Sequence, residues 1–509
     1  MSQTTNAPKR LQYFSGGEWK TSATAKYMDV FNPSTGEVIA QAPCCTSEEV
    51  EGAIRDAAKA FETWSQTPVM KRVQVLYRFR DLLDEHMDEL TRICATEHGK
   101  VWDEARGDIL KVKEPVEFAC GAPSLMMGES MMETSKGYDT VLYREPVGVF
   151  AGIAPFNFPG MIPMGWMMPL CIAAGNTIVI KAASMTPMTS MRCAELLQEA
   201  GLPAGVVNVV TCSRNEAEIF LRHPDVKGVS FVGSTAVGLH IYATAAANGK
   251  RVQALTEAKN HGLVLSDAAL ERSARGVINS CFGCAGERCM ALPAIVVEES
   301  VADRFVALLV KYAKELRIGP AYDPSSQLGP LVTAAHRQSV VDWIETGVKE
   351  GAQLVLDGRG TAVPGFEGGF YLGPTILDHV TPGMTVGDKE IFGPVVCVKR
   401  VKDFEEGLAL MNANEFANGS VIYTQSGYYA REFTRRTHGG MVGVNVGIPV
   451  PVGIFPFTGH KRSFFGDLHA LGKDGLRFFT ETKAVTSTWF DEEEKRKTRV
   501  DTWDGSVGG

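Results

Sequence analysis

One short stretch of the chain concentrates groups capable of covalent chemistry: residues 281–292, Cys-Phe-Gly-Cys-Ala-Gly-Glu-Arg-Cys-Met-Ala-Leu. Cys289 follows a glycine-bearing loop and precedes an apolar segment, residues 293–298. A thiol in this place is a candidate nucleophile toward a carbonyl carbon, and it attacks as the thiolate. An ordinary cysteine, with a pKa of ~8.5, offers only a few per cent of thiolate at neutral pH. We therefore expect the site to lower that pKa through the charge of Arg288 and through backbone N–H groups at a helix end.

Two other interpretations compete for these cysteines. Free cysteines are usually small buried apolar residues, and the chain has eleven of them. Cys281, Cys284 and Cys289 also suggest a metal ion, but their spacing without a second pair makes an incomplete ligand set for zinc or an iron–sulfur cluster. We expect no metal site.

Composition limits the class of function. A chain of 509 residues exceeds what one hydrophobic core usually serves, so two or three domains are expected. The net charge of -8 argues against a nucleic-acid or anionic-membrane surface, since both require clustered basic residues. These features favour chemistry on a small molecule.

The cellular compartment is also suggested by the sequence. An odd number of scattered cysteines does not resemble a disulfide framework and suits a reducing compartment. The first ten residues lack an apolar core, so we expect no secretory signal and a cytoplasmic protein. Residues 146–180 carry no charge, but prolines at 155, 159, 163 and 169 would break a membrane-spanning helix. We expect this segment to be buried α/β core.

The elements around Cys289 follow from hydrophobic periodicity. Apolar runs at 148–153, 177–181, 206–210 and 228–232 alternate with helical segments, which predicts a parallel sheet with helices on its faces. Ligands bind such sheets at the carboxyl ends of the strands. The segment 233–238 follows a strand and opens a helix there, although its glycine spacing is not the dinucleotide fingerprint.

Further elements complete the expected scaffold. Thr46 and Glu49 form a capping box that starts a helix through Trp64, and a second helical run extends from about residue 71 to 98. A second alternating unit runs from Val252 to about residue 450 and contains Cys289, and glycines at 358–369 indicate a surface hairpin. Residues 130–143 and 483–489 alternate apolar and polar side chains, which is typical of edge strands that pair with another chain.

Five motifs in order reveal a resemblance. They are Pro155-Phe-Asn-Phe-Pro159, Gly175-Asn-Thr-Ile-Val-Ile-Lys181, Phe231-Val-Gly-Ser-Thr235, Gly286-Glu-Arg-Cys289 and Glu390-Ile-Phe-Gly-Pro394. Together they resemble the aldehyde dehydrogenase superfamily over essentially the whole chain. The segments 258–262, 288–292 and 464–469 are similar to the CoA-acylating methylmalonate-semialdehyde dehydrogenase branch.

The resemblance implies an α/β architecture with three parts. A Rossmann-type NAD(P)-binding domain would comprise residues 1–124 and 147–257, and an α/β catalytic domain residues 258–460. A β oligomerisation arm would comprise residues 125–146 and 475–509. The expected assembly is a homo-oligomer, dimer or tetramer.

The resemblance also implies roles for individual residues. Cys289 would attack the aldehyde, and the Asn157 side chain with the Cys289 N–H would stabilise the oxyanion. Hydride would pass to a nicotinamide, leaving a thioester on Cys289. Hydrolytic relatives carry a glutamate base at the position of Leu255, so its absence favours coenzyme A as acyl acceptor. The residues expected to bind NAD or NADP are Ala154, Pro155, Phe156, Lys181, Ser184, Gly233, Ser234, Glu390 and Phe392.

Four departures from the family pattern affect specificity. Ser184 stands where relatives have a carboxylate that grips the ribose 2'-hydroxyl, so NADP becomes admissible. Glu257 replaces a glycine and is either a displaced base or a solvated charge. Glu287 replaces a glutamine and adds a negative charge that would raise the thiol pKa if it were close. Lys111 replaces the arginine that would clamp a substrate carboxylate with Arg288.

These observations predict CoA-dependent, NAD(P)-linked oxidation of a small acidic aldehyde, such as malonate or methylmalonate semialdehyde. Two alternatives remain open. The first is a hydrolytic aldehyde dehydrogenase with Glu257 as its base. The second is a catalytically silent protein of this fold, against which the presence of Cys289 and Asn157 argues.

Overall fold

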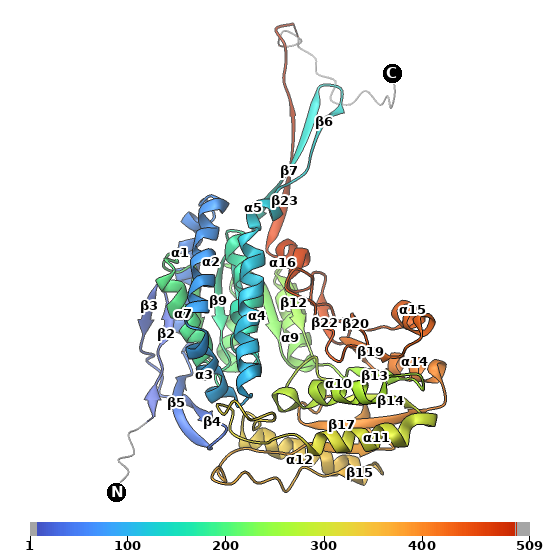
Figure 1. Ribbon diagram of the computed structural model, residues 1–509. Coiled ribbons are helices and arrows are strands. Elements are labelled where there is room, and N and C mark those ends of the chain that lie inside the picture. The colour runs from blue at the N-terminus through green and yellow to red at the C-terminus, as the bar shows by residue number, and fades with distance from the viewer. Residues whose placement is uncertain (1–7, 494, 496–509) are drawn as a thin grey trace.

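Two large β-sheets and a small projecting sheet organise the chain in the computed structural model, which describes residues 8–493 and residue 495 (Figure 1). The large sheets have eight and seven strands, and the projecting sheet has three. Parts of the expected first and third domains, residues 1–7, 494 and 496–509, lie outside the described residues.

The eight-stranded sheet confirms the predicted parallel core. Its parallel strands are β8 (Val149–Ile153), β9 (Thr177–Lys181), β10 (Val207–Val210), β11 (Val226–Val232) and β12 (Arg251–Leu255). Antiparallel strands flank them: β2 (Tyr13–Ser15), β3 (Glu18–Lys20) and β22 (Phe464–Gly466). The placement of Val252 at the start of the second unit was wrong, because β12 pairs with β11 in this first sheet.

Helices cover both faces of this sheet. They are α1 (Ser47–Trp64), α2 (Val69–Glu85), α3 (Met87–His98), α4 (Trp102–Cys120), α5 (Ala122–Leu125), a π-helical segment (Met161–Met167), α6 (Pro169–Ala173), α7 (Met188–Glu199), α8 (Arg214–Arg222) and α9 (Thr235–Ala247). The capping box at Thr46 and Glu49 is confirmed. The single helix expected over 71–98 is wrong, because the chain leaves helical geometry at His86 (φ -107°, ψ 17°) and begins again.

The uncharged segment 146–180 is confirmed as core, since it supplies β8, β9 and the buried helices between them. In the part of the chain that the structure describes, no helix is long and apolar enough to cross a membrane.

The seven-stranded sheet carries the second body. Its strands are β13 (His261–Val264), β14 (Ala294–Glu298), β15 (Gln353–Leu356), β16 (Thr375–Asp378), β17 (Val395–Val401), β19 (Gly419–Tyr423) and β20 (Met441–Val444). Its helices are α10 (Leu270–Phe282), α11 (Glu299–Lys314), α12 (Ala334–Lys349), α13 (Thr385–Asp388), α14 (Phe404–Ala413) and α15 (Gly427–Arg436). Residues 358–369 lie in the connection between the antiparallel strands β15 and β16, as the expected hairpin requires.

Smaller elements close the structure. A three-stranded sheet joins β1 (Lys9–Arg10), β5 (Glu37–Pro43) and β4 (Tyr27–Asn32), and a short pair joins β18 (Phe416–Ala417) to β21 (His460–Lys461). Helix α16 (Gly472–Phe478) leads into the last strand.

The projecting sheet consists of β6 (Ser130–Ser135), β7 (Tyr138–Pro146) and β23 (Thr480–Thr488), and it extends away from both large sheets in Figure 1. The two segments expected to be edge strands pair with each other here, in antiparallel register from Thr480 opposite Pro146 to Thr488 opposite Tyr138. All of β6 is exposed, and the side chain of Met132 is 80% exposed. A strand edge remains available for a second chain.

Candidate active site

A cavity of about 280 Å³ lies where the carboxyl ends of β8, β11 and β12 meet the second body. Cys289 and Asn157 line it together, so the structure brings the two predicted catalytic residues to one space. The other lining residues are Pro155, Phe156, Val232, Gly233, Ser234, Thr256, Glu257, Glu390 and Phe392. The position agrees with the rule that ligands bind open α/β sheets at the carboxyl ends of strands.

The loop that presents Cys289 is held in a fixed conformation. Cys284, Ala285 and Gly286 adopt left-handed backbone angles, with φ of 49°, 51° and 77°. A Cβ on Gly286 would lie 2.1 Å from the Gly393 carbonyl oxygen, so only glycine fits this approach. The chain therefore turns sharply just before the nucleophile.

Two asparagine side chains fix the other side of this loop. The Cys289 carbonyl accepts hydrogen bonds from Asn260 Nδ2 at 2.8 Å and from Asn418 Nδ2 at 3.2 Å. Asn260 also donates to the Ala291 carbonyl at 2.8 Å and accepts from Gly419 N–H at 2.7 Å. The two amides tie the nucleophile loop to the ends of β13 and β19.

The environment of the Cys289 thiol differs from the prediction. Burial and the nearby Glu390 carboxylate raise its pKa to about 12. The N–H groups of Cys289 and Met290 and the charge of Arg288 act in the expected direction and lower the pKa, but burial outweighs them. The expectation of a lowered pKa was wrong, because desolvation disfavours the thiolate.

Asn157 is held by hydrogen bonds to both its backbone and its side chain. Lys100 Nζ donates to its backbone carbonyl at 2.6 Å and to Asp108 at 3.0 Å, and all three residues are buried. The Asn157 side-chain Nδ2 donates to the Glu287 carbonyl at 3.0 Å. Because an amide nitrogen carries two protons, a second donor remains for an oxygen atom in the cavity.

Glu287 does not act on the thiol as expected. Its side chain is fully buried, and its carboxyl accepts from Val332 N–H at 3.2 Å and lies 3.9 Å from His98 Nε2. Burial raises the pKa of Glu287 well above its usual value, so the negatively charged form expected beside Cys289 is disfavoured.

The predicted cofactor residues fall into two groups. Pro155, Phe156, Gly233, Ser234, Glu390 and Phe392 line the cavity with Cys289. Ala154, Lys181 and Ser184 do not line it. They lie at the carboxyl ends of β8 and β9, where Ala154 N–H donates to the Lys181 carbonyl at 3.0 Å and Ser184 is buried. Both groups lie along one edge of the sheet.

Glu390 and Phe392 are positioned by neighbours. Glu390 accepts a hydrogen bond from Ala258 N–H at 3.2 Å, and burial together with Glu257 raises the pKa of Glu390 to about 8. Phe392 has a left-handed backbone (φ 59°), and its carbonyl accepts from His336 Nε2 at 2.8 Å. Its ring meets Phe156 edge-on at 5.8 Å.

The two predicted substrate-binding cations do not converge in this structure. Arg288 donates to Glu104 at 2.9 Å, whereas Lys111 pairs with Glu114 at 2.8 Å. Both carboxylates belong to α4, and neither cation lines the Cys289 cavity.

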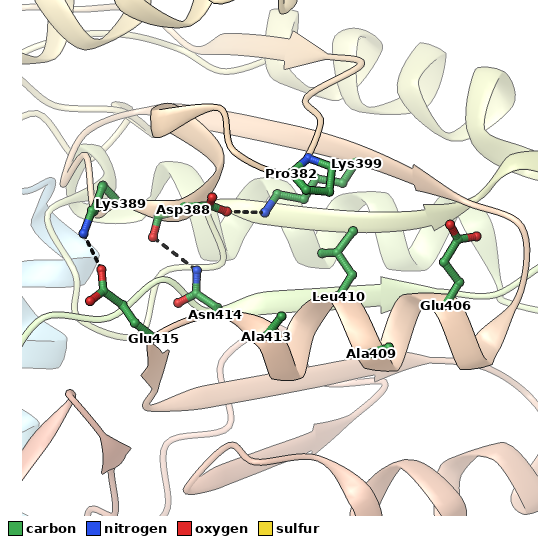
Figure 2. Close-up of a pocket in the computed structure, with 10 residues that line it drawn as sticks. All are labelled: Pro382, Asp388, Lys389, Lys399, Glu406, Ala409, Leu410, Ala413, Asn414 and Glu415. Carbon is green, nitrogen blue, oxygen red and sulfur yellow. Dashed lines mark hydrogen bonds and ion pairs between the residues drawn. The ribbon is translucent and has the colours of Figure 1, made fainter.

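A second hollow, of about 520 Å³, lies beside α13 and α14 (Figure 2). Its charged groups already have partners, since Lys389 pairs with Glu415, Lys399 pairs with Asp388, and Glu406 accepts from Lys402 N–H at 2.7 Å. It contains no thiol, so the chemistry is assigned to the smaller cavity at Cys289.

Several residues of the site carried no signal that sequence reasoning could use. Asn260 lies inside the motif at 258–262, but that motif predicts no role for its side chain. The other residues are distant in sequence from the groups that they hold: Asn418, Lys100 and His336. Thr256 lines the cavity only because β12 ends there.

With the geometry established, comparison with known proteins decides the family. The model of the aldehyde dehydrogenase family matches residues 19–485. The chain belongs to the aldehyde dehydrogenase family. As a family member it is an oxidoreductase that acts on aldehydes, and the predicted fold class is confirmed.

Relatives within the family are similar over nearly the full length. Malonate-semialdehyde dehydrogenase 2 of Geobacillus kaustophilus is 48% identical over 485 residues, which cover 95% of this chain and 100% of the relative. The protein of the same name from Oceanobacillus iheyensis is 48% identical over 489 residues, which cover 96% of this chain and 100% of the relative.

Solved structures agree with this relationship. A methylmalonate-semialdehyde dehydrogenase from Oceanimonas doudoroffii superposes with a TM-score of 0.93 at 42% identity, covering 96% of this chain and 100% of that chain. A protein assigned as methylmalonate-semialdehyde dehydrogenase from Sinorhizobium meliloti, complexed with NAD, gives 0.94 at 42% identity, covering 96% and 99%.

Proposed function

We propose that this aldehyde dehydrogenase oxidises a small acidic aldehyde, malonate or methylmalonate semialdehyde, to an acyl-CoA with NAD or NADP as oxidant. The names of its relatives support the substrate class, and NAD in the complex with one of them supports the cofactor. The observation that supports coenzyme A as the acyl acceptor is Leu255. It is a buried apolar residue at the end of β12, at the position where the resemblance implies a base in hydrolytic relatives.

The chain's own residues would act in a defined order. Cys289 gives its proton to solvent, its thiolate sulfur attacks the aldehyde carbon, and the resulting oxyanion accepts a hydrogen bond from the second N–H of Asn157 Nδ2. When bound, the nicotinamide accepts hydride from that carbon. The carbonyl then re-forms as a thioester on Cys289. The thiol sulfur of coenzyme A would attack the thioester carbon and take the acyl group as the bond to Cys289 Sγ breaks, and the thiol proton would pass through solvent to the released Cys289 thiolate.

The pocket supports the cofactor role residue by residue. Glu390 and Phe392 would contact the nicotinamide ribose and ring, and Ser234 the pyrophosphate, all from the cavity wall. Lys181 and Ser184 would contact the adenosine ribose from the neighbouring strand end. Because Ser184 has no negative charge, a 2'-phosphate is not repelled there, which admits NADP beside NAD.

The proposal includes the assembly and the compartment. The exposed edge of β6 and the exposed Met131, Met132 and Trp489 support pairing of the arm with another copy, as a dimer or tetramer. All eleven cysteines are free thiols in the structure, which supports a reducing, cytoplasmic location. The proposed domains are those that the resemblance implies: residues 1–124 and 147–257 for NAD(P) binding, 258–460 for catalysis, and 125–146 and 475–509 for oligomerisation.

A second function retains support from one observation. Glu257 lines the same cavity as Cys289, so hydrolysis of the thioester by water with Glu257 as base is the alternative. In that case free acid, and not acyl-CoA, would be the product.

Product analysis separates these functions. Purified enzyme would be supplied with malonate semialdehyde, methylmalonate semialdehyde or a neutral aldehyde of equal length, each with NAD or NADP and with or without coenzyme A. The proposal expects acyl-CoA from the acidic substrates and little turnover without coenzyme A. Free acid as the product under all conditions would contradict it.

A further inference from the structure

Glu257 lines the cavity of Cys289, but its carboxylate forms a hydrogen bond with the start of a helix. Its carboxylate oxygen Oε2 accepts a hydrogen bond of 2.8 Å from the backbone N–H of Thr235. Thr235 is the first residue of the 13-residue helix α9, which begins where β11 ends. The side chain thus reaches from the end of one strand to the start of the helix that follows its neighbour.

The start of α9 lacks a cap of its own. Ser234 occupies the N-cap position without a side-chain hydrogen bond to the helix, and the first turn contains no acidic residue. The first N–H groups of a helix have no acceptor within it, and the helix dipole favours negative charge there. Glu257 supplies that acceptor and that charge from outside the helix.

The cofactor of the proposed function, on which this inference rests, would also bind at the N-terminus of α9. Gly233, Ser234 and Glu257 line one cavity, and Ser234 is the residue expected to contact the pyrophosphate. A phosphate group seeks the same backbone donors at the helix N-terminus as the carboxylate does. Two anions cannot share one N–H, and they repel each other.

The backbone around Glu257 restricts how the conflict can be resolved. The Glu257 carbonyl accepts from Ser463 Oγ at 2.8 Å, and the N–H of the preceding Thr256 donates to the Ser463 carbonyl at 2.9 Å. Both bonds hold the main chain to the strand end, while the Glu257 side chain is only partly buried. The side chain, and not the backbone, is the part that is free to move.

We infer that Glu257 is an internal competitor for the cofactor's diphosphate: it accepts from the N-terminus of α9 and must be displaced when the dinucleotide binds. The resemblance implies a glycine at this position in the related branch, and a glycine would not compete in this way. Glu257 therefore weakens cofactor affinity while it stabilises the unliganded protein.

The released carboxylate has a defined neighbourhood. Glu390 lines the same cavity, and the two carboxyl groups interact closely enough for Glu257 to raise the pKa of Glu390. Displacement from Thr235 leaves Glu257 without its backbone donor in a cavity that already holds a carboxyl group. This explains why displacement opposes binding.

The test is a set of binding titrations on the full-length protein with ADP, which carries the diphosphate, and adenosine, which does not. Glu257→Gln keeps the size of the side chain and removes its charge, and Glu257→Gly reproduces the residue of the related branch. Both variants should bind ADP about two- to fivefold more tightly than the wild type, the range expected for a carboxylate at a helix N-terminus. Adenosine affinity should stay unchanged.

A second readout follows from thermodynamic reciprocity. Ligand-free Glu257→Gln should melt at a lower temperature than the wild type, and saturating ADP should reduce that difference. Equal or weaker ADP binding by the variants would overturn the inference, as would equal tightening of ADP and adenosine, which would indicate steric opening alone. Aldehyde-dependent NADH formation by the wild type tests the proposed function separately, because the titrations use neither aldehyde nor coenzyme A.

Discussion

The thiol of Cys289 should be far less reactive in the ligand-free enzyme than a catalytic cysteine is usually expected to be. Its pKa is raised to about 12 by burial and by Glu390. At pH 7 a thiol of this kind has roughly 3,000-fold less thiolate than an ordinary cysteine of pKa ~8.5. Alkylation by iodoacetamide should accordingly be slow and should rise about tenfold per pH unit beyond pH 9.

The assay is the rate of modification of the Cys289 peptide by mass spectrometry between pH 6 and 10. Cys44, which is also partly exposed, serves as an internal reference. Glu390→Gln is the matched perturbation: Glu390, with a pKa of about 8, is neutral below that pH and repels the thiolate above it. The variant should match the wild type below pH 8 and react faster above it. A plateau of wild-type reactivity near pH 7 would refute the reasoning.

Three further predictions concern the acyl site, the cofactor and the arm. Asn157→Ala should slow acylation by about 10²-fold through loss of an oxyanion donor, measured by single-turnover NADH formation; an unchanged rate would place the oxyanion elsewhere. Ser184→Glu should shift the preference toward NAD, since a carboxylate accepts from a ribose diol and repels a phosphate, and a constant ratio of kcat/KM values would remove Ser184 from the ribose site. Truncation before Lys483 removes most of β23 and should lower the molar mass of the oligomer measured by light scattering. An unchanged molar mass would exclude the arm from assembly.

The local elements were predictable because their signals are local. Apolar runs of five residues flanked by helical periodicity predicted β8 and β9, and the Thr46 capping box predicted the start of α1. The break at His86 was missed because the hydrophobic period continues across it. The sheet to which β12 belongs was misassigned because an apolar strand does not encode its partner.

The site was predictable in part. Motifs placed Cys289, Asn157, Glu390 and Phe392 together, and the structure brings them to one cavity. The raised pKa of Cys289 was not predictable, since it arises from burial, which depends on the packing of both bodies. The pairing of Arg288 with Glu104, 184 residues away, was hidden for the same reason.

The central claim is that Cys289 forms a thioester that coenzyme A, and not water, removes. It rests on Leu255, a buried apolar side chain where hydrolytic relatives carry a base. Without such a base the thioester should hydrolyse slowly, so deacylation should limit the rate when coenzyme A is absent. Glu257→Gln is the control for the hydrolytic alternative, because loss of that base would stall turnover after the first acylation.

Rapid mixing of enzyme, aldehyde and NAD or NADP tests this claim most directly. The account predicts a burst of about one equivalent of reduced cofactor per active site, followed by a slow steady state that coenzyme A accelerates, with acyl-CoA as the product. Cys289→Ser should abolish the burst. A steady rate that ignores coenzyme A and yields only free acid would contradict the account.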